Sequence, residues 1–174
     1  IDSLPADQPI IFGPDRNLGG YISSVTGREM LLWQGACHVH DRFSLQGILD
    51  MKKAHPGAKV LVHPECRKPL QIIADMVGST ARLLDYARKS DADTFIVVTE
   101  SGILHQMQKD CPEKRFLAAP AEDAECQCNE CEYMKMITLP KLYTALRDLQ
   151  PRVEVDPELA AKALRPIKRM LELS

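Results

Sequence analysis

Thr94-Phe95-Ile96-Val97-Val98-Thr99 is the stretch that decides the fold, because it is an almost unbroken run of aromatic and β-branched residues. Such runs are typical of strands that are buried on both faces of a parallel sheet. Apolar residues recur at helical spacing just before this run, over 83–86, and just after it, over 103–107. A strand between two helices predicts an α/β protein with parallel strands.

The same alternation extends along the chain in both directions. Shorter apolar runs predict four further strands, at 9–13, 29–33, 59–63 and 115–120. Asp15 and Ser44 are suited to capping the helices that follow such strands, and Ser79 or Thr80 to capping the helix that begins after Gly78. We therefore expect an α/β fold with three layers, αβα, built on parallel sheets.

The remaining predicted elements are helical, except for one short strand. A short helix is expected over 70–76, and one helix with a step at Pro140 is expected over 133–146. Two separate helices are expected over 157–164 and 166–173, because Pro is favoured in the first turn of a helix. A short strand is expected over 153–155.

Composition limits the classes of function. The chain has 174 residues, 45% of them apolar, and a net charge of −2, which suits one globular domain or one domain and part of a second. This balance indicates neither nucleic acid nor an anionic membrane as a partner, and no apolar run approaches the roughly 20 residues of a membrane-spanning helix. The absence of an initiator Met leads us to expect a fragment or a processed start.

Six cysteines at irregular spacing favour reduced thiols and metal ligation over a disulfide scaffold. Cys126, Cys128 and Cys131 lie within six residues, too close for all of them to face a core, so a metal, a redox pair or both are indicated. A zinc ribbon needs two Cys-x-x-Cys pairs, and only Cys128 and Cys131 form one. Cys37 together with one thiol of this loop is more typical of a cluster held by single thiolates. Cys111 is expected to be structural.

Reactive side chains follow two of the predicted strands. Cys37 and His40 come directly after the strand at 29–33, as a ligand pair or as a ligand beside a general base. His63 ends the strand at 59–63 and Glu65 lies two residues further on, a spacing that puts an imidazole and a carboxylate on one side of an extended segment.

The turn at Gly78-Ser79-Thr80 offers backbone N–H groups and hydroxyls to an anion at the start of a helix. Pro14-Asp15 and Thr99-Glu100 are further polar strand ends. The carboxyl ends of parallel strands share one edge of a sheet, so we expect the groups at five strand ends to converge, which favours an enzyme. These groups are Pro14-Asp15, Cys37 with His40, His63 with Glu65, Thr99-Glu100 and the 126–131 loop.

The motifs together resemble one protein family, quinolinate synthase, over nearly all of the chain. They are Pro14-Asp15-Arg16-Asn17-Leu18-Gly19, Trp33-Gln34-Gly35-Ala36-Cys37-His38-Val39-His40, His63-Pro64-Glu65, Val77-Gly78-Ser79-Thr80 and Cys131-Glu132-Tyr133-Met134-Lys135-Met136. The resemblance implies three α/β domains related by a pseudo-threefold axis, with a 4Fe–4S cluster at their junction. Cys37 and Cys131 match two of its three cysteine ligands, and the fourth iron is open to substrate.

The resemblance also implies the reaction. Quinolinate synthase condenses iminoaspartate with dihydroxyacetone phosphate to give quinolinate for NAD synthesis in the cytoplasm, and L-aspartate oxidase is the implied supplier of iminoaspartate. His40, His63 and Glu65 match residues that transfer protons and bind substrate. Ser79 and Thr80 match substrate contacts.

The resemblance implies a division into 1–37, the end of a domain whose start is absent, 38–131, a complete α/β domain, and 132–174, helices that pack back on an absent first domain. The chain would then hold two of three cluster ligands and be inactive alone. Ile137 stands where the family usually has Asn, and the Cys126 spacing departs from a Cys-x-x-Cys-x-x-Cys run, which argues against a redox role for Cys128.

Two other interpretations remain open. The chain could be a non-catalytic zinc module that uses the 126–131 loop with Cys37 or a histidine. It could also be a fragment that only completes a partner chain.

Overall fold

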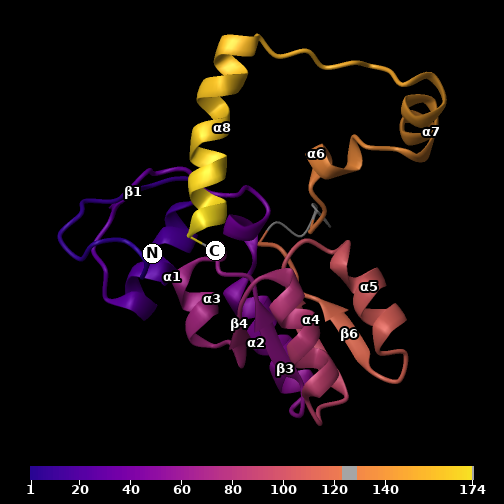
Figure 1. Ribbon diagram of the computed structural model, residues 1–174. Helices are drawn as coiled ribbons and strands as arrows, with labels where there is room; N and C mark the ends of the chain where they lie inside the picture. The colour runs from indigo at the N-terminus through magenta and orange to yellow at the C-terminus, as the bar shows by residue number, and fades with distance from the viewer. Residues whose placement is uncertain (123–128, 174) are drawn as a thin grey trace. The chain divides into compact units, whose positions relative to one another are not determined.

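The computed structural model describes residues 1–122 and 129–173 (Figure 1). The chain forms two compact units, Asp7–Met134 and a smaller one that joins Ile1–Ala6 to Lys135–Ser174. Within the described ranges, no helix has the length and apolar character needed to cross a membrane.

The larger unit is organised around a four-stranded sheet. Its strands are β3 (Lys59–Val62), β4 (Met76–Val77), β5 (Thr94–Val98) and β6 (Arg115–Ala118). The order is β4-β3-β5-β6, and every pairing is parallel, so all four carboxyl ends lie along one edge. The parallel sheet predicted from the apolar runs is confirmed.

Helices cover both faces of this sheet. They are α2 (Leu45–Ala54), α3 (Lys68–Ile72), α4 (Thr80–Lys89) and α5 (Ile103–Asp110). Alternate residues along β3 and β5 point to opposite faces: Val60 and Ile96 pack with α2 and α3, whereas Leu61 and Phe95 pack with α4 and α5. The expected three-layer αβα arrangement is therefore present.

A second, two-stranded parallel sheet precedes it. Here β1 (Ile11–Phe12) pairs with β2 (Leu31–Leu32), and α1 (Arg16–Thr26) connects the two strands. Gly19 lets α1 lie close to both strands, because a Cβ at this position would be 2.5 Å from Leu32 Cδ2 and 2.9 Å from Phe12 Cδ1. As predicted, Asp15 caps α1 and Ser44 caps α2, and of the two candidates Ser79 and Thr80 it is Ser79 that caps α4.

The helix predicted over 70–76 is wrong at its C-terminal end, where the edge strand β4 begins instead. Asp75 brings this segment to the sheet, because its carboxylate accepts hydrogen bonds from Val60 N at 2.8 Å and from Lys59 Nζ at 2.9 Å. Burial raises the pKa of Asp75, but these two donors and the nearby Lys52 charge outweigh burial and lower the pKa overall.

The C-terminal region differs from its prediction in three places. The single helix expected over 133–146 is two helices, α6 (Glu132–Lys135) and α7 (Leu139–Asp148), because Thr138 caps the second one. The two helices expected after residue 157 are one, α8 (Pro157–Glu172), with Pro166 inside it. Strong helix formers lie on both sides of that proline. No strand is present over 153–155, which the structure describes.

Candidate functional site

The site lies at the carboxyl ends of three neighbouring strands. His63 follows β3, Gly78 follows β4, and Thr99 follows β5. Hydrogen bonds extend the sheet into these exits: His63 N donates to Val98 O, and Gly78 N donates to Val62 O, both at 3.1 Å. Of these three exits, those of β3 and β5 were among the strand ends predicted to converge, whereas the exit of β4 follows a strand that the sequence did not predict.

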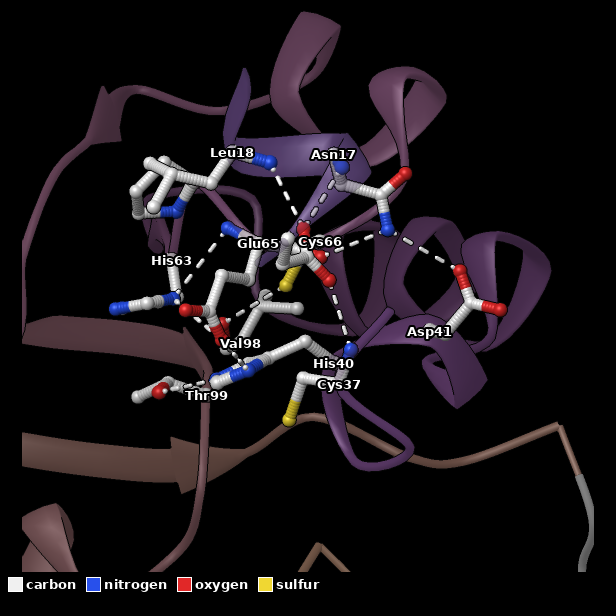
Figure 2. A network of polar contacts seen from close by, with 12 residues as sticks. Asn17, Leu18, Cys37, His40, Asp41, His63, Glu65, Cys66, Val98 and Thr99 are labelled. Atoms are coloured by element: carbon white, nitrogen blue, oxygen red, sulfur yellow. Dashed lines mark hydrogen bonds and ion pairs between the residues drawn. The ribbon is translucent and has the colours of Figure 1, made fainter. Parts of the chain in front are cut away.

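His40 is the centre of the polar network. It is 8% exposed and begins a 3-10 turn, His40–Arg42, after the β2 exit. Its Nδ1 lies 3.0 Å from Glu65 Oε2, and its Nε2 lies 3.0 Å from Thr99 Oγ1 (Figure 2). An ionised carboxylate only accepts, so in the neutral ring Nδ1 carries the proton and Nε2 accepts from the Thr99 hydroxyl. Both ring nitrogens are thus held in place.

The second histidine stacks on the first. The ring centroids of His40 and His63 are 4.4 Å apart, and the angle between the ring planes is 16°. His63 Nδ1 accepts a hydrogen bond from Glu65 N at 3.4 Å, which leaves the ring proton of the neutral form on Nε2. The predicted pair of His63 and Glu65 is therefore joined to His40 in one cluster.

Two pKa shifts set the charges in this cluster. The hydrogen bond from His40 lowers the pKa of Glu65, so this group is a carboxylate at neutral pH. Burial lowers the pKa of His63, and the electrostatic effect of the neighbouring His40 lowers it further, so His63 is neutral at neutral pH. An ionised acceptor thus lies beside a neutral imidazole, an arrangement suited to moving protons.

Cys37 brings a thiol to the same place. Its Sγ, a ring nitrogen of His40 and a carboxylate oxygen of Glu65 all lie within 4.8 Å of one another, so these three side chains could hold a metal ion. Cys66 is the contrasting thiol. It is fully buried and donates to Val98 O at 3.4 Å, and burial raises its pKa, so it is an inert core residue.

Cys131 lies at the end of the described part of the cysteine loop. It is partly buried and packs against the same core cluster as Cys37, although it does not belong to the group of ligand atoms within 4.8 Å. Its backbone N–H donates to Glu100 Oε1 at 3.3 Å. Cys126 and Cys128 lie outside the described residues.

Ser79 and Thr80 are exposed at the start of α4, next to the β3 exit. Ser79 Oγ accepts a hydrogen bond from Arg82 N at 3.4 Å. Among the described residues, no hydrogen bond or ion pair joins Ser79 or Thr80 to the two histidines or to Glu65.

Two contacts around the site were not predicted from the sequence: Thr99 was expected only as a polar strand end, and Asp41 was not selected at all. Thr99 orients His40, and Asp41 accepts hydrogen bonds from Arg16 and from the Asn17 amide. The same Asn17 amide donates to Glu65 O at 3.0 Å, so it joins α1 to the β3 exit (Figure 2). The available signal was that Thr99 is the polar residue that ends the strongest predicted strand.

A thiol, two imidazoles and a carboxylate gathered beside the strand ends of a parallel αβα domain define an α/β protein whose site could hold a metal ion. Comparison with known proteins then identifies the family. A family model described as quinolinate synthetase A protein matches residues 1–172. The chain belongs to this quinolinate synthase family.

Its relatives are similar over the whole chain. It is 52% identical to a quinolinate synthase from Thermosynechococcus vestitus, 54% identical to one from Microcystis aeruginosa and 49% identical to one from Chloroherpeton thalassium. Each alignment covers 100% of this chain and 54% of the relative. The chain therefore spans about half the length of the curated relatives that it matches.

Proposed function

We propose that this chain is the C-terminal part of a quinolinate synthase, which condenses iminoaspartate with dihydroxyacetone phosphate to quinolinate for NAD synthesis. One observation carries the proposal beyond family membership: Glu65 accepts from His40 at 3.0 Å, and His63 stacks on that ring at the strand ends. This is a proton-transfer centre, as imine formation and dehydration require.

The proposed cofactor is a 4Fe–4S cluster bound by Cys37 and Cys131, with a third thiolate from outside this chain. The donor set fits, because thiolates are the usual ligands of such clusters, and these two cysteines pack against one core cluster. When bound, the cluster supplies a Lewis acid at its open iron for the substrate's carboxylate and nitrogen.

The side chains of this chain divide the remaining work. Glu65 is ionised and accepts a proton from the substrate, while His40 holds its carboxylate in place and contacts the same substrate. His63 donates a hydrogen bond through Nε2 to a substrate oxygen. Ser79 and Thr80 bind the phosphate or a carboxylate, helped by the positive N-terminal end of α4.

The proposal divides the chain into three parts, 1–37, 38–131 and 132–174. The last part packs on a domain outside this chain, and the domains of the enzyme are arranged around a pseudo-threefold axis. Thiolate ligation favours a reducing compartment, so we place the enzyme in the cytoplasm. L-aspartate oxidase is the proposed supplier of iminoaspartate.

Activity tests the proposal in an enzyme completed with the missing half. After anaerobic reconstitution with iron and sulfide, the enzyme should form quinolinate and release phosphate from the two substrates. Glu65→Gln should lower kcat by about 10²–10⁴-fold, whereas Glu113→Gln, at an exposed loop position, should leave it unchanged. Full activity in Glu65→Gln would contradict the proposed role.

A zinc site is the second candidate, because Cys37, His40 and Glu65 place three ligand atoms within 4.8 Å. Metal content distinguishes the two. For a cluster, Cys37→Ser and Cys131→Ser should lose iron and sulfide, while Glu65→Gln and Cys111→Ser should retain both. For zinc, Cys37→Ser and Glu65→Gln should both lose a stoichiometric metal.

A further inference from the structure

Asp15 is a buried carboxylate with more than a capping role. It is 3% exposed. Its Oδ1 accepts from Asn17 N at 2.7 Å and Leu18 N at 2.9 Å, which caps α1. Its Oδ2 accepts from Cys37 N at 2.7 Å. The second oxygen therefore joins the helix start to a residue 22 positions away.

Glu100 repeats this arrangement at the other cysteine. Its Oε2 accepts from Gly102 N at 2.7 Å, next to the start of α5, and its Oε1 accepts from Cys131 N at 3.3 Å. Ser101 N also donates to Asn129 O at 2.8 Å, which fixes the backbone two residues before Cys131. Each cysteine amide thus meets a carboxylate whose other oxygen accepts from a nearby backbone amide.

We propose that Asp15 and Glu100 are positioning residues that hold the backbone amides of Cys37 and Cys131 and so present both sulfurs for the cluster. The role rests on the proposed cluster ligation. For Cys37 the clamp is two-sided, because its carbonyl accepts from Asp41 N at 3.0 Å while its amide donates to Asp15.

The carboxylates also have an electrostatic effect. An amide bonded to a carboxylate is not available to donate to a cluster sulfide, and N–H···S bonds together with net charge set the reduction potentials of such clusters. Two carboxylates, each accepting from a ligand amide, add negative charge and remove two donors. Both changes favour the oxidised cluster, so Asp15 and Glu100 should lower its potential.

Amide hydrogen exchange tests the clamp without any cofactor. Selective ¹⁵N-cysteine labelling of this chain gives one amide signal for each of its six cysteines. In Asp15→Asn the side-chain NH₂ can face the Cys37 N–H, so exchange at Cys37 should rise about tenfold or more, since bonds to charged groups contribute about 1.5–3 kcal/mol. Glu100→Gln should do the same at Cys131. Unchanged exchange at both cysteines would overturn the proposal.

The matched control is Asp156→Asn, because Asp156 caps α8 through Leu159 N at 2.9 Å. This variant should leave amide exchange at Cys37 and at Cys131 unchanged. If Asp15→Asn accelerates amide exchange at every cysteine, a second variant, Asp15→Ser, separates the clamp from general loss of stability. Its hydroxyl can still cap α1 but cannot also reach the Cys37 amide. In Asp15→Ser, faster amide exchange at Cys37 alone supports the clamp, and equally faster exchange at Cys66 overturns it.

The holoenzyme supplies the second readout. After reconstitution of the completed enzyme, Asp15→Asn and Glu100→Gln should lose iron to a chelator faster and show a higher cluster midpoint potential. If Asp15 and Glu100 act only on the structure, the substitutions should speed iron loss without changing the midpoint potential of the cluster. That result would overturn the proposed electrostatic effect of the two carboxylates. If the unsubstituted enzyme takes up no cluster, the proposed function fails, while the exchange experiment still tests the clamp.

Discussion

The hydrogen bond between Thr99 and His40 offers a sharp test of the site. Thr99 is 3% exposed, and its hydroxyl lies 3.0 Å from His40 Nε2. Thr99→Val keeps the shape of the side chain but removes the donor, so Nε2 is left buried and unpaired. An unsatisfied buried acceptor costs about 1–3 kcal/mol. We therefore expect Thr99→Val to lower the free energy of unfolding by that amount.

A double-mutant cycle isolates this contact from the other effects of each substitution. His40→Phe removes the acceptor while keeping a flat ring, and in that background Thr99→Val should cost little, because both partners are then apolar. The coupling energy between the two substitutions should be about 1–3 kcal/mol. Urea unfolding followed by circular dichroism gives the four free energies.

The control cycle pairs Thr99→Val with Ser44→Ala, which removes the cap of α2. Within the part of the chain that the structure describes, no hydrogen bond joins these two positions, so their effects should add to within about 0.5 kcal/mol. A coupling energy between Thr99 and His40 that is also below about 0.5 kcal/mol would refute the argument that Thr99 fixes the ring.

Three further predictions concern packing, pH and thiol reactivity. Gly20→Ala should stabilise α1 by about 1 kcal/mol through helix propensity, whereas Gly19→Ala adds overpacking against β1 and β2 and should be about 1–3 kcal/mol less stable than Gly20→Ala in urea unfolding. The pKa of Asp75 is lower in the folded chain than in the unfolded chain, where it is about 4. Its contribution to stability is therefore full above about pH 4 and is lost as pH falls through the folded pKa. The free energies of unfolding of Asp75→Asn and of the unsubstituted chain should converge at acid pH. Iodoacetamide should label Cys37 but not Cys66 in the folded chain, as measured by peptide mass spectrometry.

Each of these predictions has a contradicting result. Equal stability of Gly19→Ala and Gly20→Ala would show that α1 moves away from the strands at no cost. A stability gap for Asp75→Asn that stays constant from pH 7 to pH 2 would contradict the lowered pKa. Labelling of Cys66 at the rate of Cys37 would contradict its burial.

Local sequence patterns predicted most of the larger unit. The β-branched run of β5 and the helical spacing on either side of it are enough to indicate a buried parallel strand between helices. Asp15 and Ser44 were predicted as caps, and Ser79 as one of two candidates, because such side chains accept from amides only two or three residues away. The positions of Cys37, His63 and Glu65 after strands were also readable from the sequence.

Other features could not be predicted in this way. β4 is only two residues long and depends on pairing with β3, so it has no pattern of its own. Pro166 looked like a helix start, but the helix continues through it. Thr99 lies 59 residues from His40, and no local rule connects them.

The sequence by itself determined which residue types stand at the ends of strands and helices, because propensity, alternation and capping act over a few neighbouring residues. Only the tertiary structure decided which atoms meet: that Glu65 rather than another carboxylate holds His40, and that Asp15 and Glu100 each accept from a cysteine amide. The physical reason is that a hydrogen bond forms only within about 3.5 Å, and the packing of helices on the sheet sets distances on that scale between residues far apart in the chain.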